Sequence, residues 1–262
     1  MQRAVSCEQR SIMKTVKGQF ISRTDIGKVR VVNEDRVLSI VNSNGDVLLA
    51  VCDGLGGHNK GDYASQLATN ILADEFRKTS RFFGYIHIRL FLSRVLKMIN
   101  REIFTTAEKN EIYQDMGTTI VIAFLHKKKL YIAYAGDSRA YVLKDNQFIQ
   151  LTEDQSLVDY LYKTGQIKKE EMNTSSERHQ IMNALGIYPT ISYSLKIIKN
   201  DFDSILLCSD GLYNNMNDAQ ISDILKTNER LEQKVDTLIA VANSNGGSDN
   251  MAISLWEKIK ND

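Results

Sequence analysis

The sequence has few of the features that mark secreted, zinc-binding or membrane-spanning proteins. It contains one proline, Pro189, and three cysteines among 262 residues. Because Cys7, Cys52 and Cys208 show no paired spacing, neither a disulfide framework nor a cysteine-ligated zinc site is expected, and a reducing, cytoplasmic location fits best. Apolar runs such as Val47–Cys52 fall far short of the roughly 20 residues that cross a bilayer, so we expect no membrane span.

The chain also lacks an excess of charge of either sign. Lysine and arginine number 33 against 32 aspartates and glutamates, which gives a net charge of +1. Nucleic acids and anionic membranes attract proteins through a basic excess, so this balance gives no support for either partner. Hydrophobic residues make up 43% and charged residues 25%, and these ordinary values argue against wholesale disorder.

No linker rich in glycine, serine or proline divides the chain, and no repeat of solenoid length is present. We therefore expect one domain over residues 19–258. Residues 1–18 show no sustained periodicity and are expected to form a poorly ordered extension. Residues 155–184 are polar and only weakly helical, which predicts an insertion lying over the surface.

Short apolar or β-branched runs predict strands, and apolar residues at helical spacing predict helices. The predicted strands are Gln19–Arg23, Arg36–Val41, Val47–Cys52, Thr118–Leu125, Leu130–Ala135, Tyr141–Leu143, Gln147–Leu151, Ile191–Ile198, Ser204–Cys208 and Met251–Trp256. The predicted helices are Asp62–Arg77, Ile86–Phe104, Asp218–Lys226 and Arg230–Ala242. Two adjacent helices within a run of hairpins favour stacked sheets with helices outside over a doubly wound parallel sheet.

A carboxylate stands beside a buried-looking strand at four places, each time next to glycine or another small residue. These acids are Asp53, Asp137, Asp210 and Asp249. A single aspartate at a strand end is most simply a turn former, but four matched instances favour convergence on one rim. Their repulsion in a low-dielectric setting would be relieved by one or two divalent cations. Ligands that are all oxygen favour Mg²⁺ or Mn²⁺ over zinc.

Four other residues in the same segments have chemistry that suits such a site. Glu34 could hold a metal through water, and Asp35 could orient its neighbours by accepting hydrogen bonds. The planar guanidinium of Arg30 suits a phosphate, although a surface ion pair is the simpler interpretation of that residue alone. His58, in the glycine-rich segment after Asp53, could protonate a leaving oxygen, although a lone histidine is more often structural.

Seven motifs occur in one order along the chain: Thr24–Asp35, Asp53–His58, Met116–Thr119, Gly136–Arg139, Asn183–Gly186, Cys208–Leu212 and Gly247–Asn250. In this order they resemble the motifs of the metal-dependent serine/threonine protein phosphatases (the PPM family, type 2C), bacterial single-domain members in particular. The resemblance covers about Gln19 to Trp256. It implies an α+β fold, an α-β-β-α sandwich with two central, mainly antiparallel sheets flanked by helices. Residues 155–184 would be the mobile flap beside the active site.

For the site, the resemblance implies two Mn²⁺ or Mg²⁺ ions and, as in many bacterial members, a third and weaker ion. The metal ligands that it implies are Asp53, Gly54 (through its carbonyl), Asp210, Asp249, Glu34 and Asp137. Asp53 would bridge the two main ions, and Asp137 would hold the third together with Asp210. Asp35 and Asn250 would contact and orient the metal ligands without binding the metal themselves.

The resemblance also implies the reaction, which is hydrolysis of phosphoserine and phosphothreonine in proteins by a metal-bound hydroxide. The catalytic residues would be Asp53, Arg30, His58, Asp210 and Asp249. Among them, Arg30 matches the phosphate-binding arginine and His58 the proposed general acid. The expected partners are phosphorylated proteins and a cognate serine/threonine kinase, with no nucleic acid, and the expected state is a monomer.

Three alternatives stay open at this point. A catalytically inactive pseudophosphatase would keep the fold as a binding module, but such proteins lose metal ligands, and every motif acid is present here. A carboxylate-metal nuclease or phosphodiesterase is disfavoured by the neutral charge of the chain. An aspartyl-phosphate receiver would need a regular parallel βαβ frame, which the pattern of strands and helices lacks.

Overall fold

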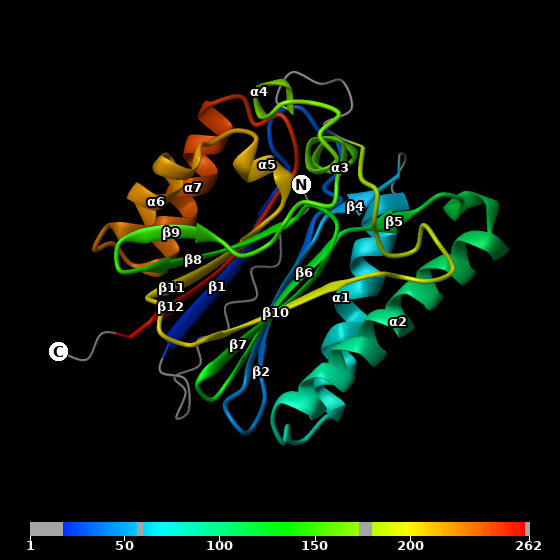
Figure 1. Cartoon of the computed structure of the whole chain (residues 1–262), viewed down its shortest axis with the longest axis horizontal. Coiled ribbons are helices and arrows are strands. Elements are labelled where there is room, and N and C mark those ends of the chain that lie inside the picture. Colours follow the sequence, from blue (N-terminus) through cyan, green and yellow to red (C-terminus); the bar gives the residue numbers. More distant parts are fainter. Residues whose placement is uncertain (1–17, 57–59, 173–179, 260–262) are drawn as a thin grey trace.

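The computed structural model describes residues 18–56, 60–172 and 180–259, which form four layers (Figure 1). Two five-stranded sheets lie face to face in the middle, and helices cover the outer face of each. One layer of helices contains α1 (Lys60–Lys78) and α2 (Tyr85–Lys109), and the other contains α5 (Asp210–Tyr213), α6 (Asp218–Lys226) and α7 (Leu231–Ser244). This architecture confirms the predicted α-β-β-α sandwich.

All pairs of neighbouring strands in the two large sheets are antiparallel. Sheet I, under α1 and α2, consists in spatial order of β10 (Ser194–Lys199), β7 (Lys129–Ala135), β6 (Ile120–His126), β3 (Val47–Cys52) and β2 (Arg36–Val41). Sheet II, under α5–α7, consists of β1 (Gly18–Asp25), β12 (Met251–Lys258), β11 (Ser204–Cys208), β8 (Arg139–Lys144) and β9 (Gln147–Gln150). A two-stranded ribbon of β4 (Gly54–Leu55) and β5 (Gly117–Thr118) stands apart from both sheets.

Strand β3 illustrates how the sequence specifies the layers. All six of its residues are buried, because side chains alternate between two covered faces. Leu48 and Ala50 belong to the core beneath α1 and α2, whereas Leu49 and Val51 belong to the core between the two sheets. An uninterrupted apolar run is therefore the pattern of a strand in the middle of this sandwich.

The antiparallel pairing brings distant strand ends to one end of the molecule. The last residue of β3 pairs with the first of β2, and the last of β7 pairs with the first of β6. In sheet II, the end of β11 lies beside the start of β12 and the start of β8. The chain segments just beyond these ends therefore converge, although they come from all parts of the sequence.

The long predicted elements are confirmed, and the differences lie in short or irregular segments. The strand predicted at Ile191–Ile198 begins at Ser194, since residues 191 and 193 pack on the core beneath α1 and α2 without pairing. Gly18, predicted in the extension, is the first residue of β1, and residues 1–17 lie outside the described residues. The strand predicted at Thr118–Leu125 is divided at Thr119 into β5 and β6, and the weakly helical segment 155–184 contains α3 (Leu157–Lys163) and α4 (Lys169–Met172). The elements that the patterns did not predict are β4, a 3₁₀ helix (Glu111–Tyr113) and α5.

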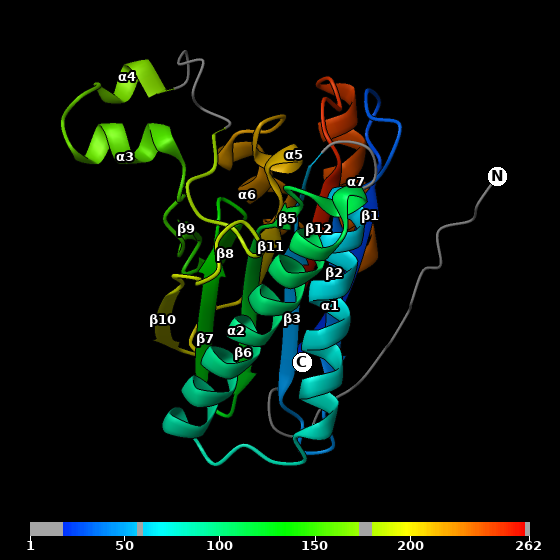
Figure 2. The ribbon, with the colours of Figure 1, turned by 90° about the vertical axis from the view of Figure 1, so that its right-hand side faces the viewer.

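Helices α3 and α4 stand away from the sandwich, beyond β9 (Figure 2). They belong to the insertion predicted at residues 155–184, whose residues 173–179 lie outside the described residues. Its identity as a flap, like the domain boundaries, stays a prediction. Within the described ranges, no helix is both long enough and apolar enough to cross a membrane.

Candidate active site

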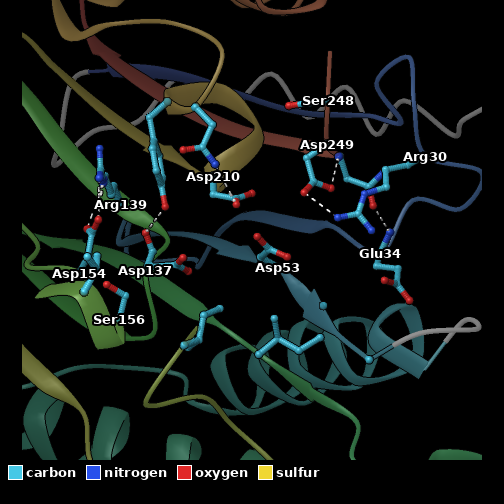
Figure 3. Close-up of a pocket in the computed structure, with 18 of the residues that line it drawn as sticks. Arg30, Glu34, Asp53, Asp137, Arg139, Asp154, Ser156, Asp210, Ser248 and Asp249 are labelled. Carbon is cyan, nitrogen blue, oxygen red and sulfur yellow. Dashed lines mark hydrogen bonds and ion pairs between the residues drawn. The ribbon is translucent and has the colours of Figure 1, made fainter. Parts of the chain in front are cut away.

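A cavity of about 830 Å³ opens where the strand ends converge (Figure 3). The sequence-predicted residues that line it are Arg30, Glu34, Asp53, Gly54, Asp137, Asp210, Asp249 and Asn250. Asp35 is buried and does not line the cavity. His58 lies outside the described residues, so its role as general acid stays a prediction.

Asp53 follows β3 directly and lies between Asp137 and Glu34 in the close-up (Figure 3). Its main chain is fixed by Thr119, whose N–H donates to the Asp53 carbonyl (2.8 Å) and whose Oγ1 accepts from the Asp53 N–H (3.1 Å). The next residue, Gly54, packs against the start of α1, where a Cβ would lie 2.2 Å from the carbonyl oxygen of Gly61. Only glycine therefore permits this close approach behind the cavity.

The cavity contains more negative charge from carboxylates than the cationic side chains around them can neutralise. Burial raises the pKa of Asp53 well above its usual range, and the charges of Asp35 and Asp210 raise it further. Burial likewise raises the pKa of Asp210, with added repulsion from Asp137 and Asp249. Since both groups lose hydration without gaining a cationic partner strong enough to compensate, the cavity favours binding of cations.

Asp137 provides the clearest example of a polar atom that could bind a cation. Its Oδ1 is buried and, within the described residues, has no hydrogen-bond partner. Its main-chain carbonyl accepts a hydrogen bond from the Tyr213 hydroxyl (3.1 Å), which positions the residue at the cavity wall. Burial, with repulsion from Asp154, raises the pKa of Asp137 to about 6. A buried oxygen of this kind is satisfied by an ion or a proton.

The donor set fits divalent cations that prefer oxygen. Carboxylates and the Gly54 carbonyl line the cavity, and no cysteine or histidine is among its described lining residues. As the side chains stand, no group of three or more Asp, Glu, His or Cys residues in the described ranges forms a ready-made cage. Ions such as Mg²⁺ usually keep several waters and take one or two carboxylates each, so widely spaced acids suit them.

Arg30 lies at the rim, on the connection between β1 and β2. Its Nη2 donates to Asp249 Oδ2 (2.8 Å), and its side chain is 51% exposed. Asn250 holds both ends of this connection, because its Nδ2 donates to the Ile26 carbonyl (3.0 Å) and its Oδ1 accepts from the Glu34 N–H (2.9 Å). The guanidinium is therefore held in place while its other N–H groups can reach a ligand.

Asp35 supports the site from behind. Its Oδ2 accepts a hydrogen bond from the Ser209 hydroxyl (2.6 Å), whose oxygen accepts in turn from the Ala252 N–H (2.8 Å). Burial raises the pKa of Asp35 to about 7. These bonds connect the residue before β2 to the residues around β11 and β12, and so couple the two sheets beneath Asp53. The orienting role of Asp35 toward the metal ligands stays a prediction.

A second group of lining residues was missed. Arg139 Nε and Nη2 donate to both carboxylate oxygens of Asp154, at 2.6–3.0 Å, and the guanidinium carbon lies 3.5 Å from the ring centroid of Tyr213. Arg139 belongs to a predicted motif, but Asp154 has no local signature. The pairing of β8 with β9 across the Asp145-Asn146 turn is the signal that could have found it, since this hairpin leads Asp154 back toward Arg139.

Known proteins share both the sequence pattern and the fold. Residues 28–255 match the model of the family described as protein phosphatase 2C. The serine/threonine phosphatase stp of Listeria welshimeri is 37% identical over 237 residues, covering 90% of this chain and 94% of that protein. The structure of the serine/threonine phosphatase Stp1 from Staphylococcus aureus gives a TM-score of 0.87 at 34% identity, covering 98% of this chain and 100% of that one.

A further solved structure contains metal ions. The catalytic domain of the serine/threonine protein phosphatase PstP, in complex with two manganese ions, gives a TM-score of 0.81 at 30% identity. The match covers 93% of this chain and 99% of that one. With a family model matched over most of its length and relatives above 30% identity, the chain belongs to the protein phosphatase 2C family, the metal-dependent serine/threonine protein phosphatases.

Proposed function

We propose that the cavity hydrolyses phosphoserine and phosphothreonine in proteins with two divalent cations bound. Membership of the family identifies the protein as a protein-serine/threonine phosphatase, as the sequence predicts. The observation that carries the proposed mechanism is the position of Arg30, a half-exposed guanidinium at the rim of the cavity that Asp53 and Asp210 also line. Cations would neutralise these acids, and the guanidinium would bind a dianionic phosphate ester beside them.

The residues that would hold the two main ions are Asp53, Gly54 (through its carbonyl), Asp210, Asp249 and Glu34. Asp137, with its unpartnered buried oxygen, would hold a third and weaker ion together with Asp210. Mn²⁺ or Mg²⁺ bound there would lower the pKa of water to supply hydroxide near neutral pH and would offset the phosphoryl charge. The PstP structure in complex with two manganese ions supports this number of main ions.

Arg30 would fix the orientation of the substrate. Its planar fork binds two phosphate oxygens at once, and the bond to Asp249 keeps it from swinging toward solvent. A phosphate group bound in this way would turn the side of its phosphorus that lies opposite the leaving oxygen toward the cavity floor. In-line displacement requires attack from that side. We propose His58 as the acid that protonates the leaving serine or threonine oxygen.

The competing functions fit less well. Every predicted metal ligand lines the cavity, so the loss of ligands that marks a pseudophosphatase is not found. Besides Arg30, the cationic side chain in the described lining is Arg139, and its charge is paired with Asp154. A nuclease would need a basic track for the polynucleotide backbone, and this acidic cavity favours a single phosphorylated side chain.

We also propose that the protein acts as a cytoplasmic monomer and opposes a serine/threonine kinase that phosphorylates the same substrates. Support for a reducing compartment comes from Cys52 and Cys208, which are buried free thiols. The kinase follows from the chemistry, since a phosphatase acts repeatedly only where another enzyme restores the phosphate esters.

The direct test is a phosphopeptide assay with purified protein. Release of phosphate is expected with Mn²⁺ or Mg²⁺ and should stop when a chelator is added, then return when the metal is restored. Asp249→Asn should remove turnover, whereas the matched variant Asp145→Asn, in the exposed β8–β9 turn, should retain it. Turnover that survives chelation, or none with either metal, would contradict the proposed mechanism.

A further inference from the structure

The end of the sandwich opposite the cavity carries a surface that combines cationic and exposed apolar side chains. Helix α1 begins beside Gly54 at the cavity and runs away from it, and α2 starts at the far end and returns (Figure 2). The 19 residues of α1 rise about 28 Å, which sets the distance between the two ends. Asn44, in the β2–β3 turn, donates to the Ser80 carbonyl and so joins that turn to the α1–α2 connection.

The chain segment that crosses this end, from the end of α1 into α2, is basic although the whole chain is almost neutral. Residues 77–101 contain seven lysines and arginines and no aspartate or glutamate. At the end itself, residues 74–90 contain four lysines and arginines and two acids, a net charge of +2, against +1 for the complete chain. Glu75 pairs with Lys78 and Arg94. The overall balance of charge therefore conceals a local basic excess.

Large apolar side chains lie within this basic region. Phe83, Ile86 and Leu90 are 74%, 70% and 62% exposed. Ile86 and Leu90 are four residues apart and so share one face of α2, with Phe83 just before the helix. We call these three residues, together with the neighbouring Arg81 and Arg89, the basal patch. Single exposed apolar residues are ordinary, but three neighbours of this size indicate an interaction surface.

The most exposed of these side chains is held in place. The ring of Phe83 stacks on His87, with centroids 5.6 Å apart and planes inclined by 14°. The guanidinium carbon of Arg81 lies 5.4 Å from the centroid of the same ring. These contacts fix Phe83 in an outward position instead of folding it back onto the core. A fixed apolar anchor loses less conformational entropy when it binds.

A second cationic element lies at the same end. The β6–β7 turn is adjacent to the β2–β3 turn, because Val47 at the start of β3 pairs with Leu125 near the end of β6. Residues Lys127, Lys128 and Lys129 of the β6–β7 turn are all exposed. Both ribbon views place the two turns and the α1–α2 connection along one edge of the molecule (Figures 1 and 2).

We propose that the basal patch docks the protein on an anionic phospholipid surface. Clustered cations attract anionic head groups, and bulky apolar side chains beside arginines on a helix enter the boundary between head groups and acyl chains. An acidic protein segment would satisfy the cations but would leave the outward-facing apolar side chains at the edge of the molecule uncovered. Docked in this way, the protein would keep its cavity facing away from the membrane and accessible to phosphoproteins.

Vesicle sedimentation of the full-length protein tests the proposal without using catalysis, so its result is independent of the proposed function. We expect binding to vesicles of phosphatidylcholine with about one third phosphatidylserine, weak binding to phosphatidylcholine alone, and a decrease with added salt. Each cation near the surface contributes roughly a fivefold change in partition. Arg81→Gln/Arg89→Gln should therefore lower partition by roughly 25-fold, and Ile86→Ser/Leu90→Ser should also lower it.

A matched control tests whether vesicle binding depends on the cations of the basal patch or only on the total charge of the protein. Lys109→Gln/Lys168→Gln removes the same charge from exposed positions at the end of α2 and just before α4, far from the basal patch, and should leave partition unchanged. Equal melting temperatures would show that all the variants are folded. Equal partition on neutral and anionic vesicles, or unchanged partition of both patch variants, would overturn the proposal.

Two other outcomes would assign the patch to a different partner. If the protein does not bind vesicles but forms a dimer in sedimentation velocity, and Ile86→Ser/Leu90→Ser dissociates that dimer, the patch serves self-association. Binding to a polyglutamate peptide but not to vesicles would assign it to an acidic protein segment.

Discussion

Removing the charge of Asp137 should stabilise the protein when no metal is bound. Its Oδ1 is buried and has no hydrogen-bond partner in the described part of the chain. Burial and the charge of Asp154 raise its pKa from 3.8 to about 6. Asparagine has nearly the same shape and carries no charge, so Asp137→Asn tests the cost of the ionised carboxylate with little change in packing.

The pKa difference gives the magnitude and the sign. A difference of about two between the folded and unfolded pKa corresponds to roughly 3 kcal/mol. The folded protein keeps this proton up to about pH 6, whereas the unfolded chain releases it near pH 4. The free energy of unfolding therefore falls as pH rises through this window. Because a buried amide also needs partners, the expected gain for Asp137→Asn above pH 7 is about 1–3 kcal/mol.

Thermal unfolding followed by circular dichroism, with a chelator present, measures the effect. At pH 8 the variant should melt roughly 3–10 °C above the wild type, and the difference should shrink toward zero at pH 4. The control is Asp154→Asn, which leaves the paired Arg139 without its carboxylate and should lower the melting temperature at pH 8. An Asp137→Asn variant no more stable than the wild type at pH 8 would refute the reasoning.

The other predictions concern catalysis and the support of the site. Asp210→Asn should reduce phosphopeptide turnover by about 100-fold or more while the circular dichroism spectrum stays unchanged, and substantial residual activity would contradict its role as ligand. Arg30→Ala should raise KM for phosphopeptide about 10- to 100-fold, with partial recovery in Arg30→Lys. His58→Ala should slow hydrolysis of a phosphopeptide more than that of an aryl phosphate, whose leaving group needs no proton, and an equal loss would argue against general acid catalysis. Ser209→Ala removes a hydrogen bond from buried Asp35 and should lower the free energy of unfolding by about 1–3 kcal/mol in urea titrations; an unchanged midpoint would show that the bond contributes nothing.

The sequence predicted the fold wherever elements are long enough to show a period. Strand β3 and helix α2 are examples, since six buried residues and repeated helical spacing leave little choice of structure. Elements of two to four residues, such as β4 and α5, were not predicted because no window of that length shows a period. They form because tertiary contacts place them, as where Gly54 packs against the start of α1.

The same distinction applies to the site. Asp53 and Asp210 could be predicted because Asp53 directly follows one apolar strand and Asp210 follows another after Ser209, and antiparallel strands of one sandwich present their ends together. The ion pair between Arg139 and Asp154 was missed, because the predicted hairpin only leads Asp154 back toward Arg139, and their contact also depends on the register of β8 against β9 and on the chain beyond β9. Local patterns thus located the acids, but the partners of each acid came from tertiary structure.

The uneven distribution of charge explains why the overall composition says so little about partners. Salt screens charges beyond about 8–10 Å, and α1 alone separates the two ends by about 28 Å. Each end would therefore act on its own partner, whatever the total charge of the chain. At the cavity, the carboxylates would repel a phosphorylated peptide until cations neutralise them, so the same acids that would bind metal would also prevent phosphate from binding without it. Acids that cost stability in the metal-free protein would thereby make occupancy by metal a condition for binding substrate.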